Sequence, residues 1–200
     1  MHLPSFHNNN FLKADKVTLI DKAINVLFLW MLPPWVLPNH ITALRLIATP
    51  PTLILLANGY YKIGAIVFVC VAATDALDGA LARTRDKITH WGMLFDPLAD
   101  KLLIIPTIII LMIAHLPRWV ALLVVSTELL IIIFALFWRE KGKIVQANMW
   151  GKIKMILEVF GIVLLFISII FSLPALIGVA SIILVISVLC AFLSLLTYGI

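Results

Sequence analysis

Long, continuously apolar stretches separated by short polar segments run along most of this chain. Six of them predict helices, at residues 41–58, 63–83, 94–114, 118–138, 153–172 and 174–197. An apolar run of about 20 residues is long enough for an α-helix to cross a hydrocarbon core ~30 Å thick. A transmembrane β-barrel would instead show short segments of alternating polarity. We therefore expect an all-α, polytopic membrane protein with six transmembrane helices over residues 37–200.

The residues before these stretches have a different pattern. Residues 11–30, "FLKADKVTLIDKAINVLFLW", place apolar side chains at near-helical spacing with lysines between them, which predicts an amphipathic helix on the membrane surface. The prolines of "LPPWVLPN" then end it. We treat residues 1–36 as a separate surface segment, and no cleavable signal peptide is expected. In the first predicted span, Pro50-Pro51 predicts a kink.

The composition supports the membrane interpretation. Hydrophobic residues make up 63% of the chain, charged residues 12%, and mean hydropathy is +1.13, which excludes an ordinary soluble domain. Both cysteines, Cys70 and Cys190, fall within apolar spans, so neither a disulfide framework nor a zinc site is expected. The formal charge of +5 fits contact with anionic lipid headgroups, and we expect no nucleic-acid partner.

Lysine and arginine are distributed unequally between the two sides that six spans would create. One side receives Lys13, Lys16, Lys22, Arg83, Arg85, Lys87, Arg139, Lys141, Lys143, Lys152 and Lys154. The other side receives Lys62 and Arg118 alone. The positive-inside rule then places both termini and the loop after residue 83 in the cytoplasm.

Four aspartates lie at the ends of the second and third predicted spans. Asp75 and Asp78 are three residues apart, and Asp96 and Asp100 are four apart, so each pair would share one helix face. A short loop makes these helices antiparallel neighbours and brings the four carboxylates together. Such carboxylates repel one another unless protonated or joined by a cation. Oxygen ligands of this kind suit Mg²⁺ or Mn²⁺.

Neighbouring residues suggest what else could bind there. Gly79 leaves room for a ligand to approach the backbone. Arg83 and Arg85 supply positive charge for a phosphate. The alternative to a metal or phosphate site is that the four aspartates are solvated acids at helix ends, where they balance the charge of nearby basic residues. Asp86, in the polar loop, is interpreted as ordinary solvated charge.

These residues match a known signature. The pattern D-x2-D-G-x2-A-R-x8-G-x3-D-x3-D is complete, at Asp75, Asp78-Gly79, Ala82-Arg83, Gly92, Asp96 and Asp100. It resembles the CDP-alcohol phosphotransferases, membrane enzymes with six transmembrane helices. Eight positions at fixed offsets make a specific motif. The resemblance extends from "LPNHITALRL" at 37–46 to "GKIKM" at 151–155.

The resemblance implies roles for individual residues. Asp75, Asp78 and Asp96 would hold one metal ion, while Asp75, Asp96 and Asp100 would hold a second, giving two Mg²⁺ or Mn²⁺ ions. Asp100 would also be the general base that takes the proton of an acceptor hydroxyl. The CDP-lipid would contact the residues at Asn39, Thr42, Gly79, Ala82, Arg83 and Thr89. A homodimer is the family expectation.

The identity of the acceptor is less constrained. "LFDPLADK" and "WGKIKM" most resemble bacterial phosphatidylglycerophosphate synthases, which implies CDP-diacylglycerol as donor and glycerol 3-phosphate as acceptor. Arg139, Lys152 and Lys154 are the candidate ligands for the acceptor phosphate. Inositol phosphate, serine and phosphatidylglycerol, the last as in cardiolipin synthase, remain alternative acceptors.

Two departures from the synthase pattern concern this acceptor region. Those synthases often carry Arg-Glu where this chain has Thr127-Glu128, and a Thr or Gln after "GKxK" where it has Met155 and Glu158. A glutamate within a bilayer is costly unless it faces the interior of the bundle. Glu128 and Glu158 therefore either pair with basic residues or shape the acceptor cavity.

Two functions from other classes are also compatible with intramembrane acids. A cation transporter would carry its acids near the bilayer midplane in interrupted helices, whereas these aspartates lie at one interface. A catalytically inactive lipid-binding scaffold would not need the complete set of acids. The sequence therefore favours a phosphatidyltransferase.

Overall fold

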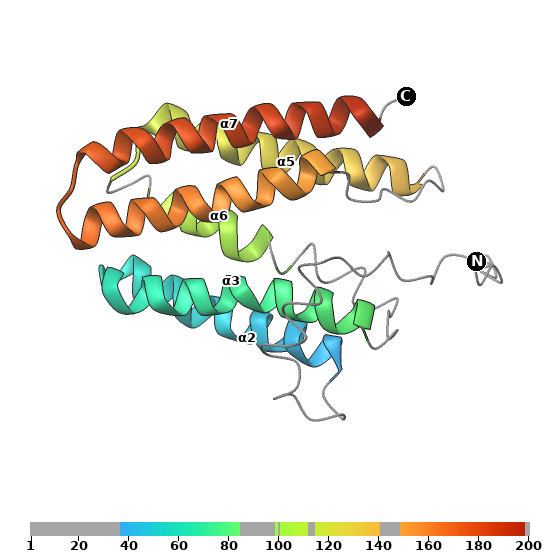
Figure 1. The fold of residues 1–200 in the computed structure, drawn as a ribbon, viewed down its shortest axis with the longest axis horizontal. Coiled ribbons are helices and arrows are strands. Elements are labelled where there is room, and N and C mark those ends of the chain that lie inside the picture. The colour runs from blue at the N-terminus through green and yellow to red at the C-terminus, as the bar shows by residue number, and fades with distance from the viewer. Residues whose placement is uncertain (1–36, 85–98, 100, 112–114, 141–148, 199–200) are drawn as a thin grey trace. The chain divides into compact units, whose positions relative to one another are not determined.

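The computed structural model describes residues 37–84, 99, 101–111, 115–140 and 149–198 (Figure 1). For some helical positions, Asp75 and Asp78 among them, it describes the backbone alone. These residues form helices and turns without strands. The helices are α2 (Pro38–Ala57), α3 (Tyr61–Thr84), the segment Lys101–Leu111, α5 (Arg118–Glu140), α6 (Met149–Ile170) and α7 (Ala175–Tyr198). The predicted surface helix at 11–30 lies outside the described residues.

Four described helices are long and apolar enough to cross a membrane. They are Asn39–Ala57, Arg118–Trp138, Met149–Ile170 and Ala175–Thr197. The second and third predicted spans correspond to shorter described apolar helices, Tyr61–Thr74 and Lys101–Leu111. The chain is therefore an integral, all-α membrane protein, while the count of six spans stays a prediction. The helix α2 continues through Pro50 and Pro51.

The chain divides into two compact units, and the division cuts through α2 and α3. The first unit contains residues 1–48 and 70–100. Most of its described part is the N-terminal half of α2 and the C-terminal part of α3. Arg45 of α2, 1% exposed, donates a hydrogen bond from Nε to Thr74 Oγ1 of α3 at 3.1 Å. A buried polar contact thus joins these two segments just before Asp75.

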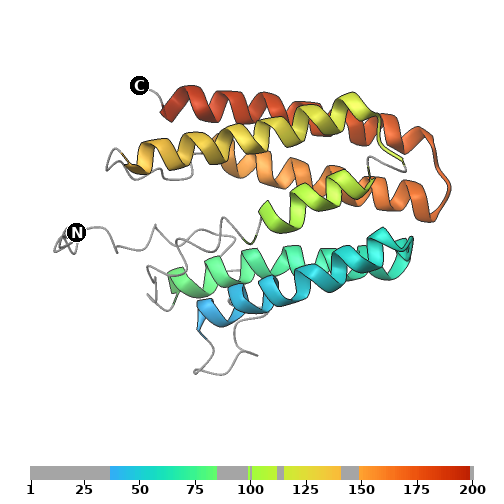
Figure 2. The ribbon, with the colours of Figure 1, turned by 180° about the vertical axis from the view of Figure 1, so that it is seen from behind.

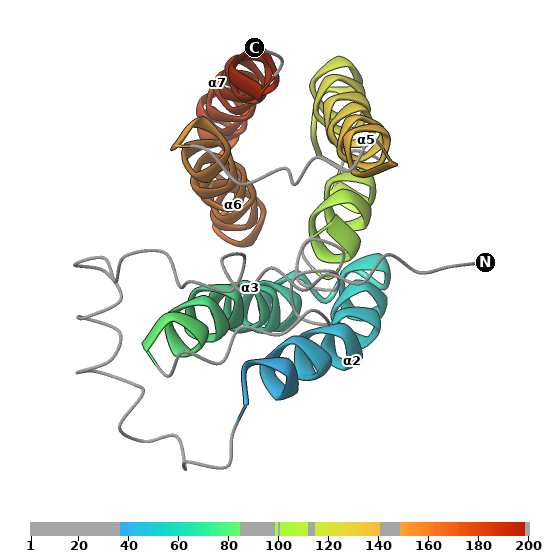
Figure 3. The ribbon, with the colours of Figure 1, turned by 90° about the vertical axis from the view of Figure 1, so that its right-hand side faces the viewer.

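The second unit contains residues 49–69 and 101–200. Within it, α6 and α7 lie side by side and antiparallel, and α7 also contacts α5 (Figures 1 and 3). A glycine permits the close approach of α6 to α7, because a Cβ at Gly161 would lie 2.9 Å from Leu184 Cδ2. The buried side chains at this contact include Ile162, Leu165 and Leu184. Figure 2 shows α5 and the segment Lys101–Leu111 of the same unit from behind.

Two left-handed residues end helices of the second unit. Gly59, with φ of 79°, follows α2, and the Gly59 and Tyr60 amides bond to the Leu56 and Leu55 carbonyls. This is a Schellman motif, in which glycine is favoured because it adopts positive φ without strain. Ser172, with φ of 53°, occupies the equivalent position after α6. In both helices, carbonyl groups of the last turn therefore accept hydrogen bonds from backbone amides of the turn that follows.

The surface of the second unit suits a lipid environment. Large apolar side chains are exposed along its helices, for example Ile133 on α5, Ile156 on α6 and Leu196 on α7, at 62%, 66% and 67%. So many large apolar side chains exposed along long apolar helices suit contact with lipid. Several buried hydroxyl groups of the same helices donate to carbonyls of the local backbone, as when Ser181 Oγ donates to the Ile177 carbonyl at 2.7 Å. The helices are thus apolar outside and selectively polar inside.

Candidate functional site

The first half of the aspartate motif lies on α3. This helix runs without interruption from Tyr61 to Thr84 and includes the positions of Asp75, Asp78 and Gly79. Three residues correspond to nearly one turn, so the two aspartates occupy neighbouring positions on one helix face. Asp96 and Asp100 lie outside the described residues. Convergence of all four carboxylates therefore remains a prediction.

The chemistry of this half-motif fits a divalent metal. Asp75 and Asp78 offer hard oxygen donors from successive turns of one rigid helix, which is the donor type that Mg²⁺ and Mn²⁺ accept. Within the described residues no group of three or more His, Cys, Asp or Glu side chains forms a separate metal site. The motif remains the place where a metal is expected.

The predicted contacts to the CDP-lipid divide between α2 and α3. Thr42 is fully buried in the first turns of α2, and Asn39 is partly exposed at its start. Gly79, Ala82 and Arg83 lie on the last turns of α3, where the structure describes their backbone alone. Thr89 falls outside the described residues. Thr42, Gly79, Ala82 and Arg83 are helical as predicted, and Asn39 is helical although it precedes the predicted span. Contacts of these residues with a ligand stay a prediction.

The contact between Arg45 and Thr74 stabilises the helix that carries the first aspartates. Thr74 Oγ1 accepts from Arg45 and donates to the Val71 carbonyl at 2.6 Å. A buried guanidinium is costly unless its donors are satisfied. The arrangement therefore fixes the position of α3 one residue before Asp75 and also brings a permanent positive charge close to that residue's backbone.

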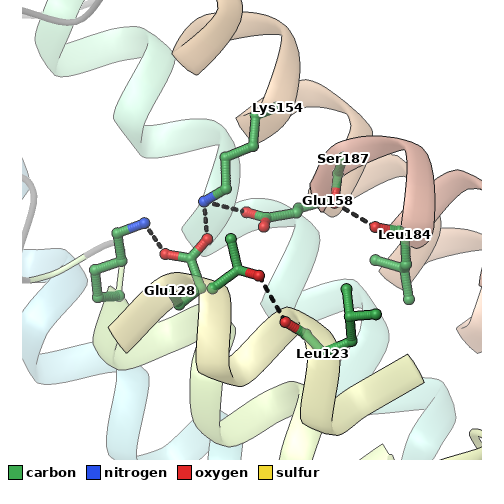
Figure 4. Close-up of polar contacts among 8 residues, drawn as sticks. Leu123, Glu128, Lys154, Glu158, Leu184 and Ser187 are labelled. Carbon is green, nitrogen blue, oxygen red and sulfur yellow. Dashed lines mark hydrogen bonds and ion pairs between the residues drawn. The ribbon is translucent and has the colours of Figure 1, made fainter. Parts of the chain in front are cut away.

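A buried cluster of four charges lies in the second unit, on three helices. The Glu128 carboxylate of α5 receives the ammonium groups of Lys101 and Lys154, and Lys154 Nζ also lies 2.9 Å from Glu158 Oε2 (Figure 4). The exposed fractions of these side chains are 15% for Lys101, 3% for Lys154, 1% for Glu158 and 0% for Glu128. We call these four residues the charge cluster.

The charges of the cluster balance. Two ammonium groups face two carboxylates, and Lys154 of α6 lies between Glu128 and Glu158 (Figure 4). Removing ions from water costs several kcal/mol each, so burial of this kind requires opposite charges at close range. Pairing with basic residues, one of the two interpretations of the glutamates, is therefore confirmed.

The predicted ligands of the acceptor phosphate are found in different environments. Lys152 is exposed on the first turn of α6, whereas Lys154 is buried in the charge cluster. Arg139 lies at the C-terminal end of α5, where its backbone alone is described. Among the residues that the structure describes, acidic side chains contact Lys154 but not Lys152.

Sequence reasoning missed two members of these polar contacts. Lys101, which directly follows Asp100 and pairs with Glu128, is not singled out in the sequence analysis. Arg45 was included only within the matching segment "LPNHITALRL". A single arginine within an apolar run is a signal that could have identified it, because such a charge needs a buried partner.

Comparison with known proteins gives the chain a family context. A family model described as CDP-alcohol phosphatidyltransferase matches residues 35–193. The matched region contains every described helix up to the last turns of α7. It also contains all the motif positions from Asp75 to Asp100.

Several bacterial proteins are similar in sequence. The CDP-diacylglycerol–glycerol-3-phosphate 3-phosphatidyltransferase of Bacillus subtilis is 34% identical over 134 residues, 59% of this chain and 69% of that protein. A probable phosphatidylglycerophosphate synthase of Mycobacterium tuberculosis is 34% identical over 133 residues, 63% of each chain. Rickettsia typhi has a protein of the same name as that of Bacillus subtilis. It is 32% identical over 133 residues, 64% of this chain and 75% of that protein.

Proposed function

The chain belongs to the CDP-alcohol phosphatidyltransferase family, and we propose that it transfers a phosphatidyl group from CDP-diacylglycerol to glycerol 3-phosphate. The products would be phosphatidylglycerophosphate and CMP. The observation that carries this proposal is the family match over residues 35–193, which includes the complete motif. The names of the Bacillus and Rickettsia relatives support this donor and this acceptor.

In the proposed reaction, a hydroxyl oxygen of glycerol 3-phosphate attacks the β-phosphorus of CDP-diacylglycerol. A new P–O bond forms to the acceptor, and the bond from that phosphorus to the bridging oxygen breaks. The electron pair leaves with CMP, and Asp100 accepts the proton of the attacking hydroxyl. Asn39, Thr42, Gly79, Ala82, Arg83 and Thr89 would bind and orient the CDP group.

Asp75, Asp78, Asp96 and Asp100 would hold two Mg²⁺ or Mn²⁺ ions, and the helical spacing of the first two supports this assignment. When bound, such ions stabilise the charge that develops on phosphoryl oxygens. The buried Arg45 would keep α3 in place through Thr74. Arg139, Lys152 and Lys154 are the proposed contacts to the acceptor phosphate.

The proposed setting is a bacterial cytoplasmic membrane, with both termini and the aspartates on the cytoplasmic side. This orientation follows from the excess of basic residues on that side. It would let a soluble acceptor meet a donor whose acyl chains remain in the bilayer. The resemblance to the family also leads us to propose a homodimer.

The experiment is a CMP-release assay on purified protein supplied with CDP-diacylglycerol and Mg²⁺. Glycerol 3-phosphate, inositol phosphate, serine and phosphatidylglycerol are offered one at a time. We expect release with glycerol 3-phosphate. Release with another acceptor alone would refute the assigned acceptor but keep the chemistry, and release without added metal would refute the metal assignment.

A further inference from the structure

The charge cluster places Lys154 in a position where its positive charge is already balanced. Its ammonium contacts Glu128 of α5 and lies 2.9 Å from Glu158, one turn later on its own helix. All three side chains are at most 3% exposed. An anion that approaches Lys154 therefore meets two carboxylates as well as one ammonium.

Glu128 and Glu158 are not equivalent within this cluster. Glu128 is also paired with Lys101, from the segment Lys101–Leu111. If Lys154 turned toward another anion, Glu128 would keep that second cation. Glu158 makes its direct ion pair with Lys154, whereas Lys101 acts on it at longer range, so it is the carboxylate with which an incoming anion would compete.

We propose that Glu158 sets the affinity for the acceptor phosphate by competing with it for Lys154. The proposal rests on the proposed function, in which Lys154 binds glycerol 3-phosphate. In the absence of acceptor the four charges cancel, and a phosphate gains little from a neutral cluster. Binding exchanges the ion pair of Lys154 with Glu158 for one with the phosphate. Glu158 is thus a positioning residue that acts through Lys154.

The test compares the Glu158→Gln variant with the wild-type enzyme. Glutamine keeps the size and hydrogen-bonding capacity of the side chain but leaves the cluster with a net positive charge. We expect KM for glycerol 3-phosphate to fall roughly three- to ten-fold, because close charge pairs influence binding strongly. Inorganic phosphate, tested as a competitive inhibitor, should bind more tightly by a similar factor. KM for CDP-diacylglycerol should stay unchanged.

Ser168→Ala is the matched control, because it removes a buried polar group from the same helix without changing charge. Ser168 is 3% exposed and donates to the Leu173 carbonyl at 2.8 Å, at the opposite end of α6 from Lys154. We expect both acceptor constants to remain at the wild-type value. If any change of a buried polar side chain in α6 altered these two constants through the structure, Ser168→Ala would change them as well as Glu158→Gln.

The outcomes separate this inference from the proposed function. Suppose that wild-type protein turns over glycerol 3-phosphate, but that Glu158→Gln leaves the KM for this acceptor and the phosphate inhibition constant unchanged or raised. The competition by Glu158 is then refuted, while the proposed function stands. If wild-type protein does not use glycerol 3-phosphate, the acceptor assignment fails and this inference fails with it. Should Glu158→Gln not fold, Glu158→Asp must show a smaller decrease in the same two constants, and no decrease would refute the proposal.

Discussion

Neutralising Glu128 should destabilise the protein more than any other single substitution in the charge cluster. This side chain is fully buried and pairs with both lysines. Glu128→Gln leaves Lys154 with Glu158 and removes the carboxylate that Lys101 faces. Removing one partner of a buried ion pair typically costs about 3–5 kcal/mol, because the remaining charge stays desolvated.

The assay is thermal unfolding of the purified protein in detergent. For a chain of this length 1 kcal/mol shifts the midpoint by about 2–4 °C, so we expect a decrease of roughly 6–20 °C. Thr127→Val is the matched control on the adjacent residue. Thr127 is 3% exposed and donates to the Leu123 carbonyl of its own helix at 2.7 Å. Its loss should cost about 1 kcal/mol.

A double-mutant cycle isolates the ion pair between Glu128 and Lys101. Lys101→Met alone should also destabilise, whereas the double variant should lose less than the sum of the two single losses by at least ~1 kcal/mol. A midpoint for Glu128→Gln equal to that of Thr127→Val would refute the reasoning. Strict additivity in the cycle would also show that the two side chains do not interact.

Three further predictions concern other parts of the chain. Gly161→Val should lower the unfolding midpoint, because a Cβ there would lie 2.9 Å from Leu184 Cδ2 and overpacking costs about 1–3 kcal/mol; an unchanged midpoint would contradict the close approach of α6 and α7. Thr74→Val should cost about 1.5–3 kcal/mol in the same assay, since it removes the acceptor of a charged hydrogen bond from Arg45 Nε. Asp100→Asn should abolish CMP release without changing the unfolding midpoint by more than a few degrees, and full turnover in this variant would exclude Asp100 as the base.

The apolar helices were predictable because the length and polarity of a membrane span follow directly from the bilayer. The predicted span at 118–138 corresponds to α5. The start of α6 was placed at 153, whereas the helix begins at Met149. Gly151 and Lys152 interrupt the apolar pattern in this first turn, but they do not end the helix.

The polar contacts were predictable only where their partners are close in sequence. Lys154 and Glu158 are four residues apart on one helix, so their pairing follows from helical spacing. Lys101 and Glu128 are separated by 27 residues, and Arg45 and Thr74 by 29. Those contacts depend on how two helices pack, which the local pattern does not specify. The sequence indicates that a glutamate within an apolar span needs a basic partner, and the structure shows that Lys101 and Lys154 are the partners of Glu128.

The central claim is that the protein transfers a phosphatidyl group to glycerol 3-phosphate and releases CMP. Its most direct test is to measure both products of one reaction. Purified protein is mixed with CDP-diacylglycerol and glycerol 3-phosphate, with Mg²⁺ or with EDTA, and CMP and lipid products are quantified by mass spectrometry. We predict one phosphatidylglycerophosphate for each CMP with Mg²⁺, and neither product with EDTA. CMP release without a matching amount of this lipid, or equal formation of both products in EDTA, would contradict the account.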